Sequence, residues 1–155
     1  MKLRSMVYED VPTVTLLDRV DNLRPWTEPM FYEELRLDSF CRVVVDETQT
    51  LQAFLVARRL LDEWHLLTLK VTPSCRGQGL ARTLMLALIA HGIESDARTI
   101  LLEVRASNQP AMNLYENLGF LSVGIRKNYY PGPTMAEDAV IMERRTDRKN
   151  EFNPF

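Results

Sequence analysis

Cysteine and histidine are scarce in this chain of 155 residues, which has two of each. Two cysteines, Cys41 and Cys75, cannot build the disulfide framework of a small secreted domain, so we expect free thiols in the reducing cytoplasm. The histidines, His65 and His91, lie far apart in the sequence. Because a protein metal site gathers several ligands, we expect no metal centre.

Long apolar runs and an excess of positive charge are also missing. No segment approaches the ~20 apolar residues that a membrane helix needs. The basic first residues meet Glu9 and Asp10 before any apolar region of signal-peptide length. The formal net charge of −2 provides no large cationic surface for a phosphate backbone. We therefore expect neither a membrane nor a nucleic acid as a partner.

The remaining composition, 46% hydrophobic and 26% charged, is that of an ordinary globular protein. We expect one domain over residues 1–145 and a polar tail over residues 146–155, with fraying from Glu143 onward. The patterns predict an α/β or α+β domain with a mixed sheet. Strands are expected at residues 3–7, 41–45, 51–58, 64–71, 99–105, 120–125 and 139–142. Helices are expected at residues 10–24, 27–35, 78–91 and 108–118, with Asp10, Thr27 and Asn108 as caps and Gly92 and Gly119 as stops.

The turn between the expected strand 64–71 and helix 78–91 carries the clearest chemical signal. Gly77 and Gly79 lie just before the first helical turn, where backbone N–H groups lack partners and the helix dipole is positive. Glycines let the chain approach phosphate oxygens closely, and Arg76 and Arg82 add positive charge. The segment predicts an anion site, although a glycine turn that only begins a helix would have the same pattern.

Two other phosphate-binding motifs fit this turn poorly. A P-loop needs lysine and serine or threonine after its last glycine, but leucine and alanine follow Gly79. A dinucleotide-binding fingerprint would use Gly77, Gly79 and the downstream acid Glu103. Five residues, however, separate the strand from Gly77, and Arg82 stands where glycine or alanine is required.

Two stretches of the chain carry motifs of a known family. Residues 76–81, Arg-Gly-Gln-Gly-Leu-Ala, match the pattern Gln/Arg-x-x-Gly-x-Gly/Ala. Residues 102–120 are similar to the run Glu-Val-Arg-x-Ser-Asn, Ala-x-x-Leu-Tyr, Leu-Gly-Phe almost residue for residue. The chain thereby resembles the GNAT superfamily of acetyltransferases, in which the first motif binds pyrophosphate, and within it the RimI-type N-terminal acetyltransferases. Asn-Tyr-Tyr-Pro at 128–131, Glu-Asp-Ala at 137–139 and Pro-Trp at 25–26 continue the resemblance. Strong similarity covers residues 61–142, and the first sixty residues match weakly.

The resemblance implies a GNAT fold, in which a mixed, mostly antiparallel sheet of six to seven strands is flanked by about four helices. The fourth and fifth strands are expected to be parallel and splayed, with acetyl-CoA as co-substrate in the gap between them. Backbone amides at the glycine turn would then hold its pyrophosphate, and the end of the fourth strand its pantetheine arm. The implied cofactor-binding residues are Leu69, Lys70, Val71, Arg76, Gly77, Gln78, Gly79, Leu80, Ala81, Arg82 and Asn108.

The resemblance also implies a catalytic pair, with Glu103 as general base and Tyr115 as general acid. An amine that attacks a thioester must lose protons, and the departing thiolate must gain one. Spacing alone favours Glu103 as a solvated strand end and Tyr115 as a core aromatic, whereas the intact family pattern favours catalysis. Trp26, Tyr129 and Tyr130 lie in expected loops that flank the acceptor groove in that family, so we expect them to contact the acceptor.

The implied acceptor is the N-terminal α-amine of a protein, specifically an alanine of a ribosomal protein. Lys70, Ala81 and the tail 143–155 depart from the RimI pattern, and a lysine or small-molecule amine is the main alternative acceptor. A non-catalytic acyl-CoA-binding module is a further alternative, but the presence of Glu103 and Tyr115 argues against it. We expect Cys75 to be a bystander, because no histidine or acid stands near it in an activating arrangement.

Overall fold

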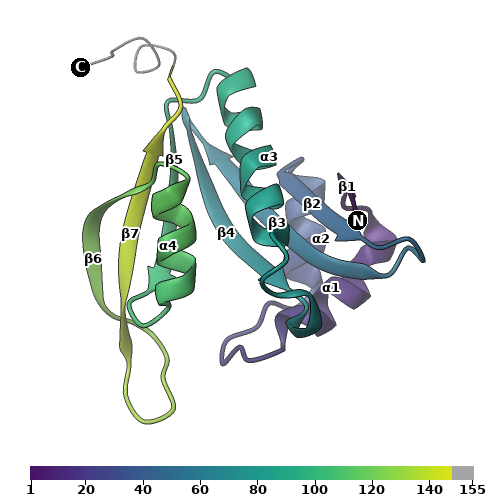
Figure 1. The fold of residues 1–155 in the computed structure, drawn as a ribbon, viewed down its shortest axis with the longest axis horizontal. Helices are drawn as coiled ribbons and strands as arrows, with labels where there is room; N and C mark the ends of the chain where they lie inside the picture. Colours follow the sequence, from purple (N-terminus) through teal and green to yellow (C-terminus); the bar gives the residue numbers. More distant parts are fainter. Residues whose placement is uncertain (148–155) are drawn as a thin grey trace. The chain divides into compact units, whose positions relative to one another are not determined.

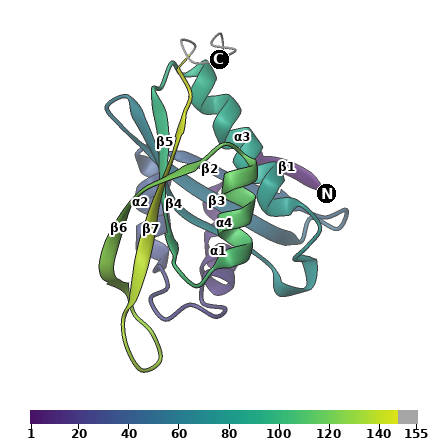
Figure 2. The same ribbon diagram turned by 60° about the vertical axis from the view of Figure 1, so that its left-hand side comes forward.

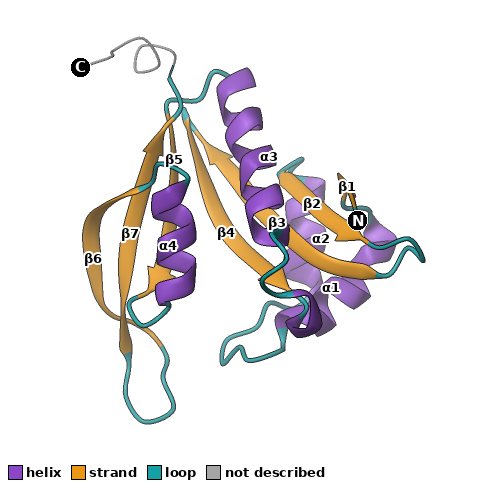
Figure 3. Ribbon diagram, viewed as in Figure 1, coloured by secondary structure: helices purple, strands orange, loops and turns teal. Residues whose placement is uncertain are grey.

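Seven strands form one mixed sheet in the computed structural model, which describes residues 1–147 (Figures 1 and 3). Their order across the sheet is β1-β2-β3-β4-β5-β7-β6. The strands are β1 (Lys2–Ser5), β2 (Phe40–Val45), β3 (Leu51–Leu60), β4 (Glu63–Val71), β5 (Thr99–Arg105), β6 (Leu121–Tyr130) and β7 (Glu137–Arg145). The helices are α1 (Val11–Asp18), α2 (Glu28–Arg36), α3 (Leu80–Glu94) and α4 (Gln109–Asn117), with short 3₁₀ turns η1 (Tyr8–Asp10) and η2 (Pro73–Cys75). The predicted α/β class, with a mixed sheet of six to seven strands and about four helices, is confirmed.

The described chain separates into two compact units. The first contains residues 1–58 and 67–88, and the second contains residues 59–66 and the described residues from 89 onward. None of the helices within residues 1–147 is long and apolar enough to cross a membrane. The prediction of a single domain over residues 1–145 stays a prediction.

In the first unit, β1, β2 and β3 pair in antiparallel fashion, and α1 and α2 bury their apolar residues together with them. Phe31 of α2 is completely buried and meets Phe54 of β3 edge-on at 5.6 Å between ring centroids. Such aromatic pairs add roughly 0.5–1.5 kcal/mol beyond their buried area. This packing anchors α2 and gives the loop before it a fixed base.

Helix α1 ends at Asp18, so the prediction that it continues to Arg24 is wrong. The buried carboxylate of Asp18 accepts a hydrogen bond from the backbone N–H of Trp26 at 2.7 Å, which turns the chain back. Asp21 takes a left-handed conformation with φ of 52° in the same loop. Asp10 precedes α1 as predicted, but its carboxylate binds the Val7 N–H at 2.8 Å instead of capping the helix.

In the second unit, β5 lies between β4 and β7, and helix α4 lies against one face of this part of the sheet (Figure 2). The parallel pairing of β5 with β4 is confirmed and covers three residue pairs, Glu63–His65 with Thr99–Leu101. The antiparallel pairing of β5 with β7 covers its whole length. Gly119 ends α4 as predicted, with φ of +90°, which a residue with a side chain adopts only under strain.

Three boundaries in the second unit differ from the prediction. Helix α3 runs through Gly92 to Glu94, because Gly92 does not take the left-handed conformation of a helix-ending glycine, so the prediction that it stops the helix is wrong. Strand β6 reaches Tyr130, which places the tyrosine pair in a strand and not in a loop. Glu143 belongs to β7 and is paired with Leu101, so the predicted fraying there is wrong. The rest of the predicted tail, residues 148–155, lies outside the described residues.

Candidate active site

The glycine turn between η2 and α3 is open and exposed. Gly77 and Gly79 have φ values of +78° and +82°, the left-handed conformation that favours glycine. Apart from its chain neighbours, a Cβ built on either glycine would meet no atom of residues 1–147 within 4 Å. The two glycines are therefore required by the backbone conformation and leave free space for a ligand to approach the main chain.

The N-terminus of α3 presents backbone donors to this space. The first helical hydrogen bond from this end runs from the Thr83 N–H to the Gly79 carbonyl at 3.0 Å. Among the residues that the structure describes, none accepts a hydrogen bond from the N–H groups of residues 80–82. Arg76 and Arg82 are exposed beside them, as is Gln78. Unpaired N–H groups, a positive helix end and two guanidinium groups fit a phosphate-bearing ligand such as acetyl-CoA.

The end of β4 carries the other predicted cofactor contacts, Leu69, Lys70 and Val71. These residues lie beyond the three pairs that join β4 to β5. The Lys70 ammonium donates a hydrogen bond to the Val20 carbonyl in the loop after α1, and burial lowers the pKa of Lys70. The lysine that departs from the family pattern therefore supports the α1–α2 loop.

Glu103, the predicted base, lies on β5 within the second unit. Its carboxylate forms an ion pair with Arg126 of β6, with 3.1 Å between Oε1 and Nε. The Glu103 side chain is 27% exposed and that of Arg126 is 53% exposed. Glu103 is accordingly a paired and partly buried acid, and not a freely solvated strand end.

Tyr115, the predicted acid, is almost completely buried on α4 and meets Phe120 at 5.9 Å between ring centroids. Burial, with a smaller effect of Tyr130, raises the pKa of Tyr115 to about 12. The phenol therefore keeps its proton at neutral pH, as a proton donor must. Asn108 caps this helix as predicted, since its side chain accepts a hydrogen bond from the Ala111 N–H at 3.2 Å.

Tyr129 and Tyr130 end β6 with their rings nearly perpendicular and 5.0 Å apart. The guanidinium of Arg126 lies 5.2 Å from the Tyr129 ring centroid, and that of Arg105 lies 4.6 Å from the Tyr130 ring centroid. Arg105 also donates a hydrogen bond to the Pro131 carbonyl at 2.8 Å. Burial first, and then the charge of Glu103, raise the pKa of Tyr130 to about 12. Glu103 and both tyrosines therefore belong to one cluster that two arginines hold together.

The sequence did not identify Arg105 and Arg126 as site residues, although Arg105 lies within the Glu-Val-Arg run. Trp26 belongs to the first unit, where its ring packs 5.0 Å from that of Phe31 and remains partly exposed. The Cys75 thiol donates a hydrogen bond to the Gln52 side-chain oxygen at 3.3 Å and contacts no base among the described residues. The described residues contain no group of three or more histidines, cysteines or acids that would hold a metal.

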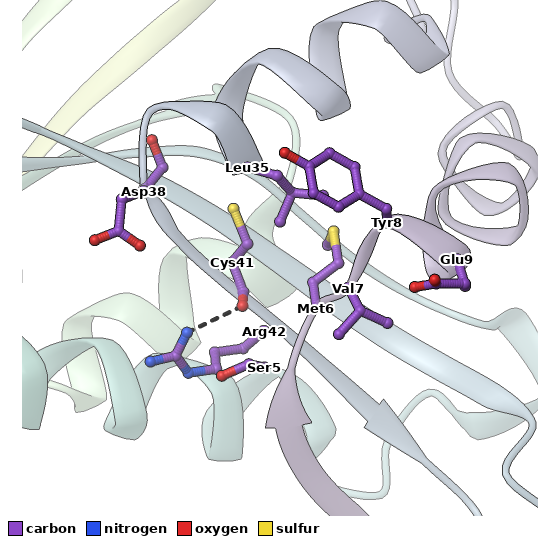
Figure 4. A pocket seen from close by; sticks show the side chains of 10 residues that line it. Ser5, Met6, Val7, Tyr8, Glu9, Leu35, Asp38, Cys41 and Arg42 are labelled. Atoms are coloured by element: carbon purple, nitrogen blue, oxygen red, sulfur yellow. Dashed lines mark hydrogen bonds between the residues drawn. The ribbon is translucent and has the colours of Figure 1, made fainter.

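A hollow of about 420 Å³ opens elsewhere in the first unit, beside β1 and the start of β2 (Figure 4). None of the predicted site residues lines it. Cys41 does, but burial raises the pKa of its thiol to about 12, so the thiol is not a nucleophile at neutral pH. The hollow is therefore separate from the predicted site residues.

Comparison with known proteins decides the family. Residues 11–120 match the model of the acetyltransferase (GNAT) family. The chain belongs to the GNAT family. It is thus an acetyl-CoA-dependent N-acetyltransferase, which confirms the enzyme class and the co-substrate predicted from the sequence.

Relatives within the GNAT family are similar over nearly the whole chain. The [ribosomal protein bS18]-alanine N-acetyltransferase of Escherichia coli K12 is 34% identical over 140 residues, which are 90% of this chain and 94% of that protein. Its counterpart from Salmonella typhimurium is 35% identical over 133 residues, 86% of this chain and 89% of that protein. The crystal structure of the Escherichia coli ribosomal-protein-S18-alanine N-acetyltransferase superposes with a TM-score of 0.88 at 32% identity, covering 99% of both chains.

Proposed function

We propose that this enzyme acetylates the N-terminal α-amine of proteins that begin with alanine, with a ribosomal protein as acceptor. The observation that carries the proposal is the 34% identity, over 90% of the chain, to an enzyme named for alanine N-acetylation of ribosomal protein bS18. A ribosomal acceptor also supports the cytoplasmic location expected from the scarcity of cysteine. Residues 1–145 would act as one catalytic domain.

Acetyl-CoA is the acyl donor, and the open glycine turn supports the proposed position of its pyrophosphate. The N–H groups of Leu80, Ala81 and Arg82 would donate to the phosphate oxygens, with charge from Arg76. The main chain of residues 69–71 would bind the pantetheine arm and the thioester carbonyl. Asn108 would contact the cofactor with the part of its amide that does not cap α4.

The proposed reaction is direct transfer without an acyl-enzyme. The neutral amine nitrogen attacks the thioester carbonyl carbon, and Glu103 takes the proton that the nitrogen loses, directly or through one water. The carbon–sulfur bond then breaks, and Tyr115 gives its phenolic proton to the sulfur. Return of the proton from Glu103 to Tyr115 through solvent restores both residues for the next turnover.

The acidity of the acceptor favours an α-amine. An α-amino group has a pKa near 7.7–8.0 and a lysine side chain one near 10.4, so freeing the amine at pH 7 costs roughly 1 kcal/mol and roughly 4.6 kcal/mol respectively. A partly exposed carboxylate such as Glu103 is an adequate base for the first amine. Trp26, Tyr129 and Tyr130 would form the walls that contact the first residues of the peptide.

Mass spectrometry of a peptide panel tests the proposal. The panel holds a peptide with a free N-terminal alanine, the same peptide with a blocked N-terminus and one internal lysine, and spermidine. We expect acetylation of the first at least 10² times faster than of the other two. Faster acetylation of the lysine peptide or of spermidine would contradict the proposed acceptor and leave the GNAT assignment in place.

A further inference from the structure

Glu103, the proposed general base, is already paired with a cationic side chain. Glu103 lies on β5 and Arg126 on β6, with β7 between them. Ala139 of β7 is the residue opposite Arg126 on one side and opposite Arg105 on the other. Because Ala139 has only a methyl group, the Arg126 side chain can reach over β7 to the Glu103 carboxylate, 3.1 Å away.

Two acids at the start of β7 are paired with cations as well. Glu137 lies 3.6 Å from a guanidinium nitrogen of Arg105. Asp138 lies 3.3 Å from the ammonium of Lys127. Each of these three carboxylates, that of Glu103 included, is therefore paired with one cationic side chain. Because Arg126 pairs with it, Glu103 presents no unpaired negative charge to an approaching acceptor.

This balance matters because potential acceptors differ in charge. At pH 8 about half of an α-amine population is neutral, whereas less than about 1% of lysine side chains are. An unpaired carboxylate would attract the ammonium form, and a guanidinium beside the carboxylate cancels most of that attraction. The binding of a neutral amine does not depend on this attraction, so the guanidinium does not weaken it.

We propose that Arg126 determines the acceptor class by neutralising Glu103, so that the site discriminates against lysine side chains and polyamines. This inference rests on the proposed function, because it takes Glu103 as the group that the acceptor amine approaches. Arg126 is a specificity-determining residue and not a catalytic one. Its contact with the Tyr129 ring at 5.2 Å fixes the guanidinium between the base and the proposed wall of the groove.

The test measures the ratio of kcat/KM for two peptides, one with a free N-terminal alanine and one with a blocked N-terminus and an internal lysine. We expect Arg126→Gln to lower this ratio roughly tenfold, through a higher kcat/KM for the lysine peptide. Arg126→Lys keeps the charge and should keep the wild-type ratio. Lys127→Gln is the matched control, because it removes a charge from the same strand without touching Glu103, and its ratio should not change.

A purely structural role of Arg126 would lower kcat/KM for both peptides together and leave their ratio intact. That result would overturn the inference, as would an equal change of the ratio in Lys127→Gln. A second measurement varies the salt concentration. The increase of kcat/KM for the lysine peptide in Arg126→Gln should become smaller at higher salt, because salt screens the attraction between Glu103 and the ammonium. A gain that does not respond to salt would also overturn it. A wild-type preference for lysine would refute the proposed function itself and is distinct from each of these results.

Discussion

Substitution of Gly79 tests whether the glycine turn binds acetyl-CoA through its backbone. Gly79 has φ of +82°, and a left-handed conformation costs a residue with a side chain roughly 1–2 kcal/mol. Since a Cβ there meets no atom of the described residues within 4 Å beyond its chain neighbours, Gly79→Val should lose about that much stability and remain folded. The new side chain would occupy the space proposed for the pyrophosphate. We expect the KM for acetyl-CoA to rise at least tenfold, which corresponds to about 1.4 kcal/mol.

Gly79→Asn is the matched variant, because asparagine tolerates positive φ and still places a side chain at the turn. Thermal unfolding of both variants measures the backbone strain, and initial rates at saturating peptide measure the KM for acetyl-CoA. Both variants should show the raised KM, whereas only Gly79→Val should show the full loss of stability. An unchanged KM in either folded variant would refute the assignment of the turn to the cofactor.

The remaining predictions concern the chemistry and the acceptor groove. Glu103→Gln and Tyr115→Phe should each lower kcat by a factor on the order of 10² or more, with little change in the KM for acetyl-CoA. A wild-type kcat in both variants would show that neither residue acts in the chemical step. Cys75→Ser should keep kcat within a few fold, whereas an acetyl group trapped on Cys75 during turnover would contradict direct transfer. Trp26→Ala and Tyr130→Ala should raise the KM for the peptide more than that for acetyl-CoA, and the opposite order would place these aromatics outside the groove.

Much of the fold was predictable because it depends on local signals. The glycine turn before α3, the cap of α4 by Asn108 and its stop at Gly119 were all correctly placed. The errors at helix ends occurred where the local pattern allows two outcomes. Helix α1 stops early because the Asp18 carboxylate binds the Trp26 N–H, and α3 continues through Gly92 because this glycine keeps a helical backbone, unlike Gly119. Neither feature is visible in the sequence pattern around the boundary.

The site was predictable only in part for the same reason. The family motif over residues 102–120 identified Glu103 and Tyr115 as candidates, and their catalytic roles remain predictions. The ion pair of Glu103 with Arg126 depends on the register of three strands and on the small side chain of Ala139 between them. Such an arrangement depends on contacts between residues far apart in the sequence, and no local spacing of residues predicts it. The charge balance at the proposed base therefore became apparent only from the structure.

The most direct test of the central claim uses one peptide that begins with a free alanine and contains one internal lysine. The peptide is incubated with the enzyme and acetyl-CoA at pH 7, and fragmentation mass spectrometry locates the acetyl group at low conversion. Our account predicts acetylation of the α-amine, with the internal lysine at least about 10² times slower. Acetylation mainly on the lysine would contradict the claim that this GNAT enzyme modifies protein N-termini.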